Sequence, residues 1–194
     1  IGIQSFNDKL LQLVGRRHNA NQAIQAVRTA QAEGMNNISI DLMYALPTQT
    51  MEEWKADIAK ALELNVPHIS SYGLIYEDGT SLTQLLEQGK ISAINEEEEM
   101  LMYDHLVDLL TQHGYEHYEV SNYALKGYRS QHNSSYWSGA EYLGIGAGAH
   151  SFNGAERHWS IQSLTEYIAY REYEREVLTA KDRYNEYIMT SMRR

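Results

Sequence analysis

A carboxylate interrupts an apolar stretch of this 194-residue sequence: Asp41, within residues 37–45. Ile38, Ile40 and Leu42 alternate with it at the period of two that is typical of a β-strand. A buried carboxylate without partners would cost several kcal/mol, so Asp41 must accept hydrogen bonds. Two interpretations stay open: Asp41 pairs with groups of its own fold, or it binds a ligand.

A second polar side chain, Gln4, lies near the end of a short predicted strand at residues 1–6, and a third strand is predicted at residues 68–75. In parallel α/β sheets, ligands bind at the carboxyl ends of the strands, where Gln4 and Asp41 both fall. We therefore expect these two side chains to face one site.

Apolar residues at helical spacing predict the helices that position these strands. They are predicted over residues 8–14, 20–33 and 51–64. Thr50 and Glu53 form a capping box at the start of the third helix. The order β-α-β-α-β predicts parallel neighbouring strands with helices on one side, because such crossovers are right-handed in nearly all proteins. Three strands with one covered face indicate part of a barrel rather than a doubly wound sheet.

The second half of the chain has a different character. Further helices are predicted over residues 81–89, 95–113, 163–177 and 184–192, and a strand over 118–122. Glycines alternate at positions 144, 146 and 148, which predicts a strand or turn approached closely by another backbone or a flat ligand. Their spacing is not that of a dinucleotide-binding loop. His113 and His117 lie four apart, but Gly114 ends the helix between them, so we expect no metal site there.

Composition excludes several classes of partner. The formal net charge of −10 disfavours nucleic acid and anionic membrane surfaces, since both would repel this chain. No apolar run approaches the roughly 20 residues that span a bilayer, and no signal segment opens the chain, so we expect a cytoplasmic protein. The absence of cysteine excludes thiolate nucleophiles and a cysteine-ligated cluster within this chain. The sequence begins inside a strand and ends inside a helical pattern, so we expect it to be a fragment.

Five segments together carry a family resemblance: residues 3–6, 15–18, 40–50, 118–124 and 132–137. The most specific are Asp-Leu-Met-Tyr-Ala-Leu-Pro from position 41 and His-Asn-Ser-Ser-Tyr-Trp from position 132. In this order they resemble the oxygen-independent coproporphyrinogen III oxidase family of radical SAM proteins, and within it the HemW-type heme chaperone branch. Ala45 stands where the family usually has glycine.

The resemblance implies an α/β fold, a partial (β/α)6 radical SAM barrel. Residues 1–80 would hold its last three strands, and residues 81–194 an α+β accessory region that stops before or within the C-terminal helical domain. The family's cysteine triad, C-x3-C-x2-C, would lie upstream of Ile1. S-adenosylmethionine and a 4Fe-4S cluster are therefore expected in the full-length parent, whereas this chain alone is expected to be inactive.

The resemblance also assigns S-adenosylmethionine to Gln4, Arg16 and Asp41. Their chemistry agrees, because a carboxylate accepts from ribose hydroxyls, a guanidinium pairs with the methionine carboxylate and an amide can serve either. Met43 and Ile75 would supply apolar walls for adenine. For each of these two alone, plain core packing is the alternative.

A second set resembles the family's heme-binding motif: His132 as ligand to heme iron, with Asn133, Tyr136 and Trp137 beside the porphyrin. The alternative is that His132 lies in a β-turn with its hydrogen bonds satisfied, and that Tyr136 and Trp137 pack in the hydrophobic core.

Three functions are consistent with this sequence. The first is binding of heme and its transfer to an acceptor protein, with the radical SAM site in a supporting role. The second is an oxidase that converts the propionates of coproporphyrinogen III to vinyl groups. The third is a non-catalytic half-barrel whose exposed strand edge is covered by the missing half or by self-association with a partner copy.

Overall fold

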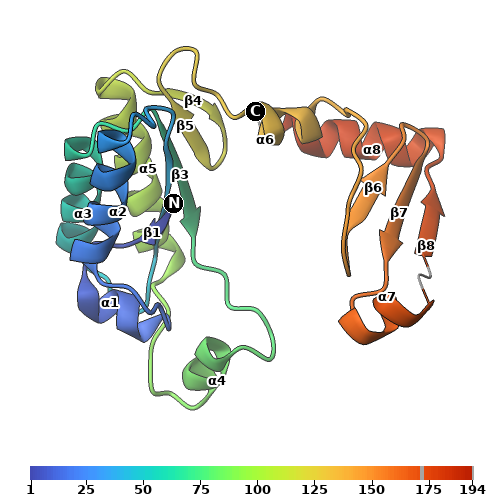
Figure 1. The fold of residues 1–194 in the computed structure, drawn as a ribbon. Helices are drawn as coiled ribbons and strands as arrows, with labels where there is room; N and C mark the ends of the chain where they lie inside the picture. Colours follow the sequence, from blue (N-terminus) through green and yellow to red (C-terminus); the bar gives the residue numbers. More distant parts are fainter. Residues whose placement is uncertain (171–172, 194) are drawn as a thin grey trace. The chain divides into compact units, whose positions relative to one another are not determined.

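The computed structural model describes residues 1–170 and 173–193, which form two compact units, Ile1–Arg129 and Ser130–Arg194 (Figure 1). This division differs from the boundary that we expect after residue 80 between barrel and accessory region, and that boundary stays a prediction. Residues 81–129 belong to the first unit because they contribute a helix to its core and two strands to its sheet. No helix of the described residues is long and apolar enough to cross a membrane.

The first unit is built on a five-stranded sheet in the order β1-β2-β3-β5-β4. Its strands are β1 (Gly2–Gln4), β2 (Ser39–Tyr44), β3 (His68–Gly73), β4 (Glu116–Glu119) and β5 (Asn122–Ala124). The first three are parallel neighbours, which confirms the predicted β-α-β-α-β order, and β5 then pairs antiparallel with β3.

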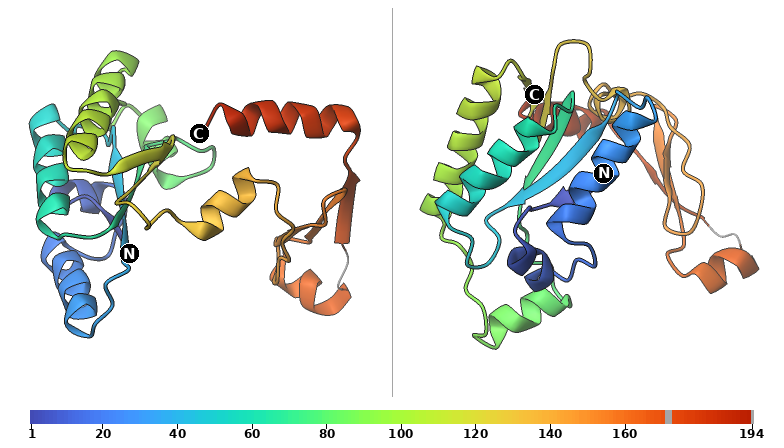
Figure 2. Two further views of the ribbon diagram at one scale, coloured as in Figure 1. Left: turned by 90° about the horizontal axis from the view of Figure 1, so that it is seen from above. Right: turned by 60° about the vertical axis from the view of Figure 1, so that its left-hand side comes forward.

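Helices cover one face of this sheet, as two views show (Figures 1 and 2). They are α2 (Ala20–Ala32), α3 (Met51–Glu63) and α5 (Glu96–Gln112). The unit also contains α1 (Asp8–Leu13) and α4 (Ser81–Glu87), and α4 lies on a loop away from the sheet (Figure 1). The predicted capping box at α3 is confirmed: the Glu53 amide donates to the Thr50 hydroxyl, and the Glu53 carboxylate accepts from the Thr50 amide. Helix α2 begins with a second capping box, between Asn19 and Gln22.

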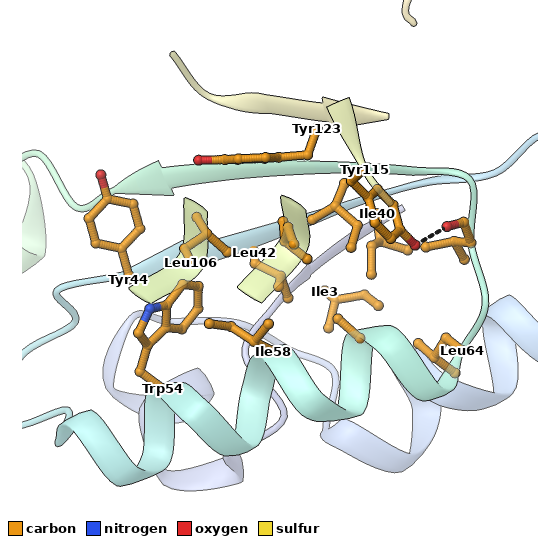
Figure 3. Packing of buried hydrophobic residues seen from close by; sticks show 14 of the residues in the cluster. Ile3, Ile40, Leu42, Tyr44, Trp54, Ile58, Leu64, Leu106, Tyr115 and Tyr123 are labelled. Atoms are coloured by element: carbon orange, nitrogen blue, oxygen red, sulfur yellow. Dashed lines mark hydrogen bonds between the residues drawn. The ribbon is translucent and has the colours of Figure 1, made fainter. Parts of the chain in front are cut away.

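The core lies between the sheet and helices α2, α3 and α5 (Figure 3). Trp54 is fully buried there, and its indole Nε1 donates to the Met102 carbonyl over 2.9 Å. The Tyr115 hydroxyl donates to the Val66 carbonyl over 2.5 Å. Trp54 and Tyr115 are thus buried with their polar atoms paired.

Two adjoining short strands replace the single strand predicted over residues 118–122. β4 and β5 form an antiparallel hairpin, in which His117 lies opposite Tyr123 and Glu119 opposite Asn122. The turn between them is held by the Glu119 carboxylate, which accepts from the Ser121 amide over 3.0 Å. Alternation alone did not reveal this turn.

The second unit contains α6 (Gln131–Trp137), β6 (His150–Phe152), β7 (Glu156–Ser160), α7 (Leu164–Tyr170), β8 (Tyr173–Val177) and α8 (Ala180–Ser191). Strands β6, β7 and β8 form an antiparallel sheet in that order. A Cβ on Gly144 would lie 2.1 Å from the His150 carbonyl oxygen, so the close backbone approach predicted for this glycine is confirmed.

The helix predicted over residues 163–177 is wrong beyond Tyr170. Residues 171–172 lie outside the described residues, and Tyr173–Val177 is strand β8. Five residues of β8 pair with β7, and Glu174 accepts from the indole of Trp159 over 3.0 Å. Pairing with a distant strand has overridden the local helical pattern.

Candidate functional site

The sheet face turned away from the core helices is polar. Along β2, Ser39, Asp41 and Met43 are partly exposed, whereas the residues between them are buried. The strand register continues this face in one row across all five strands: Gly2, Asp41, Ser70, Asn122 and Glu119. The face thus presents polar groups from segments that lie far apart in the sequence.

Three of the predicted site residues converge over Gly2. A Cβ built on this glycine would lie 2.9 Å from Nε2 of Gln4, 3.1 Å from Nη2 of Arg16 and 3.8 Å from Oδ2 of Asp41. The missing side chain of Gly2 leaves the space in which an amide, a guanidinium and a carboxylate meet. The expectation that Gln4 and Asp41 face one place agrees with this geometry, and their ligand stays a prediction.

The backbone at Gln4 is strained. Its φ is +70°, and the Ser5 amide donates to the Ile3 carbonyl over 2.9 Å, the hydrogen bond of a γ-turn with positive φ. The loop after α1 holds this end of β1, since Nε2 of His18 lies 3.0 Å from the Ile3 carbonyl. Arg16 adds a weaker contact of 3.3 Å to the carbonyl of Gly2. Backbone strain of this kind concentrates at functional sites.

The turn after β2 is strained as well. Ala45, at the position where the family usually has glycine, has a φ of +56°, and Thr48 has a φ of +66°. The Gln49 amide donates to the Leu46 carbonyl over 2.9 Å and closes a turn around Pro47. A left-handed conformation costs a residue with a Cβ about 1–2 kcal/mol. The alanine therefore makes this turn less favourable than glycine would.

The two predicted apolar wall residues differ in position. Met43 lies on β2, two residues from Asp41 and on the same face. Ile75 follows β3, and its side chain is 77% exposed. Plain core packing is therefore wrong for Ile75, whereas its role beside adenine stays a prediction.

A buried histidine that sequence reasoning missed lies on the polar face. His68 Nδ1 is 2.7 Å from the Ser39 hydroxyl, and Nε2 is 2.7 Å from the Tyr118 hydroxyl. Burial lowers the pKa of His68, and the nearby Asp41 carboxylate partly opposes this effect. The imidazole is therefore held neutral between two hydroxyls. The only signal in the sequence was its place at the start of a strand.

A chain of polar contacts, also missed, links the hairpin to β3. The Ser70 hydroxyl donates to Oδ1 of Asn122 over 2.6 Å, and the Asn122 amide donates to the Glu119 carboxylate. All three side chains are buried. Glu119 and Asn122 belong to the 118–124 segment that carried the family resemblance, which was the available signal.

Behind Gln4, a buried carboxylate anchors the next two residues. Asp57 accepts from the Ser5 hydroxyl and from the Phe6 amide, each over 2.7 Å. Burial raises the pKa of Asp57 to about 6, the two hydrogen bonds lower it, and the Glu53 carboxylate adds a small increase. Asn7 extends the network by donating to Glu53 over 2.8 Å. Helix α3 thus fixes the loop that follows β1.

The second predicted set lies on a helix rather than in a β-turn, so the β-turn alternative is wrong. Helix α6 places His132 and Tyr136 one turn apart, with their rings edge-on and 5.0 Å between centroids. His132 is exposed, Tyr136 is 42% exposed, and Asn133 and Trp137 are partly buried. The guanidinium of Arg193 lies over the Trp137 ring, 4.8 Å from its centroid.

Next to this helix is a pocket of about 740 Å³ within the second unit. Tyr136 and Trp137 line it together with residues from the sheet and from α8, whereas His132 and Asn133 do not. The structure therefore divides the predicted heme residues between the pocket wall and the exposed side of α6.

No group of three or more acidic or histidine side chains suited to a metal ion occurs in the described part of the chain. His113 and His117 have separate partners: His113 Nδ1 lies 2.8 Å from the Leu109 carbonyl, and His117 stacks on Tyr123 at 4.5 Å.

Comparison with known proteins agrees with this architecture. The sequence pattern of the Radical SAM superfamily matches residues 1–61. The heme chaperone HemW of Lactococcus lactis is 39% identical over 198 residues, which cover 100% of this chain and 52% of that protein. The radical SAM match thus lies in the first 61 residues of this chain. The HemW of Haemophilus influenzae is 43% identical over 163 residues, covering 77% of this chain and 38% of its relative.

A solved structure shows the same fold. The Escherichia coli coproporphyrinogen III oxidase HemN, described as a radical SAM enzyme, superposes with a TM-score of 0.78 at 21% identity. The match covers 98% of this chain and 48% of HemN. The predicted partial radical SAM fold is thereby confirmed. The chain spans about half the length, or less, of the relatives that it matches.

Proposed function

We propose that the full-length protein binds heme and passes it to an acceptor protein, with its radical SAM site in a supporting role. The observation that carries the proposal is the exposed imidazole of His132 on α6, edge-on to Tyr136. Among the residues that the structure describes, no hydrogen bond occupies its ring nitrogens. Several relatives at 35–43% identity carry the name heme chaperone HemW, which supports the same reading.

The chemistry of α6 fits a heme ligand. Neutral imidazole is a good axial ligand to heme iron, and an exposed ring on a short helix can reach one without unfolding its surroundings. Tyr136 and Trp137 supply aromatic faces for the porphyrin, and Asn133 supplies an amide at its edge.

Radical SAM family membership implies S-adenosylmethionine and a 4Fe-4S cluster in the full-length protein. The groups around Gly2 fit the first of these: Asp41 accepts from ribose hydroxyls, Arg16 pairs with the methionine carboxylate, and Gln4 binds either. Met43 and Ile75 would flank the adenine. When both cofactors are bound they supply a 5′-deoxyadenosyl radical, and the cysteines that hold the cluster are absent from this chain.

A heme titration of the full-length protein, followed by absorbance, tests the proposal. Wild type should shift the Soret band, and His132→Ala should reduce the shift. His158→Ala is the matched control, since His158 lies in the same unit next to Glu156 and does not line the pocket.

An assay for coproporphyrinogen turnover under reducing conditions with S-adenosylmethionine distinguishes this proposal from the main alternative, an oxidase. The chaperone proposal requires that no protoporphyrinogen forms. Turnover, together with a heme spectrum indifferent to His132, would support the oxidase instead.

The remaining expectations concern partners and location. β1 is an edge strand of the sheet in this chain. We expect the preceding part of the barrel, or failing that a second copy of the protein, to cover this edge. The cytoplasmic location and the identity of an acceptor protein also stay predictions.

A further inference from the structure

The pocket in the second unit has the chemistry of a site for a planar ligand. Its volume of about 740 Å³ lies in the range of small-molecule and cofactor sites. Its aromatic walls come from three parts of the unit: Tyr136 and Trp137 on α6, Tyr142 and Phe152 beside or in β6, and Tyr187 on α8.

Cationic groups lie at the same pocket. Arg157 is engaged, because it forms a two-point ion pair with Glu186 over 3.0 and 3.1 Å. Arg183 also lines the pocket, and no acidic side chain of the described residues pairs with it. Apolar walls with an available guanidinium suit a flat aromatic ligand that carries carboxylates, as a porphyrin does with its propionates.

An imidazole from outside the family motif also reaches this pocket. His150, the first residue of β6, lines it, whereas the motif histidine His132 does not. The His150 ring stacks on Trp159 with 5.7 Å between centroids and 21° between planes. Trp159 is itself fixed by its hydrogen bond to Glu174. No hydrogen bond within the described part of the chain occupies the ring nitrogens of His150.

We propose that His150 is an axial ligand to the iron of heme bound in this pocket. The proposal rests on the proposed function and deepens it by adding a ligand that the motif does not contain. His150 is exposed, oriented by stacking and surrounded by aromatic walls, which are the conditions that an iron-ligating imidazole requires.

The test compares heme with metal-free protoporphyrin IX in the full-length protein. His150→Ala should weaken heme binding by at least about tenfold and change the spin state of the iron in electron paramagnetic resonance spectra, because one axial nitrogen is lost. Added imidazole should restore the wild-type spectrum. Binding of metal-free protoporphyrin IX, followed by fluorescence, should be unchanged, since it has no iron to ligate.

His158→Ala is again the control, because His158 lies opposite Ser151 in the next strand, with its ring 3.3 Å from the Glu156 carboxylate. It should leave both titrations unchanged. If His150→Ala binds heme as wild type does while His132→Ala does not, the assignment of His150 is wrong and the proposed function stands. If His150→Ala weakens the binding of metal-free protoporphyrin IX as well as that of heme, His150 acts by packing and its role as an iron ligand is overturned. Wild type that binds no heme would overturn both proposals.

Discussion

Replacing Asp57 with asparagine should stabilise the first unit at neutral pH and leave its stability at acidic pH almost unchanged. Asp57 is 2% exposed, and its two carboxylate oxygens accept from the Ser5 hydroxyl and the Phe6 amide. Asparagine keeps both contacts, because its oxygen can accept from Phe6 and its amide can donate to the Ser5 oxygen. It differs from aspartate mainly in that it carries no charge at any pH.

The magnitude follows from the pKa of Asp57, which burial raises from its ordinary value of 3.8 to about 6. Between these two values the folded state binds more protons than the unfolded state, so the free energy of unfolding falls as the pH rises. The stability of the protonated form is fully present below pH 3.8 and is lost as the pH rises through about 6. Each unit of pKa difference corresponds to 1.36 kcal/mol, so the free energy of unfolding is lower by about 3 kcal/mol at pH 7.5 than at low pH.

Urea unfolding at about pH 4 and about pH 7.5 measures this difference. Trp54 reports on the first unit, provided that Trp137 and Trp159 of the second unit are first replaced with phenylalanine. The free energy of unfolding of Asp57→Asn should exceed that of the parent by about 1–3 kcal/mol at the higher pH. At the lower pH the difference should be less than about 0.5 kcal/mol. Asp104→Asn, on the exposed side of α5, is the matched control and should change stability by less than about 0.5 kcal/mol.

Two results would refute the reasoning. Parallel pH profiles for wild type and Asp57→Asn would mean that Asp57 does not bind its extra proton in the folded state. An Asp57→Asn variant that is less stable at pH 7.5 would mean that the charge strengthens the hydrogen bonds from Ser5 and Phe6 by more than burial destabilises the charged carboxylate.

Asp57→Ala, which leaves both donors without an acceptor, should be destabilised by about 1–3 kcal/mol per unsatisfied group.

Three further predictions concern other parts of the chain. Asp41→Ala should weaken binding of S-adenosylmethionine to the full-length, cluster-loaded protein by about 1.5–3 kcal/mol in calorimetry, since a charged acceptor is lost; unchanged binding would remove Asp41 from the site. Thr50→Ala should lower the free energy of unfolding by about 1 kcal/mol, because the amide of Glu53 loses its cap, and an unchanged urea midpoint would contradict this. The cysteine-free chain by itself should hold no iron–sulfur cluster, and 5′-deoxyadenosine formed by the purified chain would disprove this.

Contacts close in sequence could be predicted, and contacts across the sheet could not. The capping box of α3 was readable because Thr50 and Glu53 lie three residues apart and hydrogen-bond within one helical turn. Ser5 and Asp57 lie 52 residues apart, and nothing local to either indicates the other. Ser70 and Asn122 are also 52 residues apart, and they meet only because β5 returns beside β3.

The same distinction explains the error at Tyr173–Val177. Helical spacing is a local property, and the sequence continues it past Tyr170. The strand there is stabilised by β7, a partner that precedes it by more than ten residues and whose pairing was not predicted. Gln4 and Asp41 were predicted to face one site from their places near the ends of parallel strands, and Arg16 was added by the family resemblance, which carries spatial information that periodicity lacks.

The convergence over Gly2 depends on contacts that hold the end of β1 from two directions. A positive φ at a residue with a side chain persists only where its surroundings fix it. Here His18 and Arg16 hold the carbonyls of β1 before Gln4, and Asp57 holds the two residues after it. Asp57→Asn keeps the second of these restraints, whereas Asp57→Ala removes it. The Gln4 amide should therefore stay beside Asp41 in the first variant and lose its fixed position in the second. By this reasoning Asp57, which lies on helix α3, sets the geometry of the polar face.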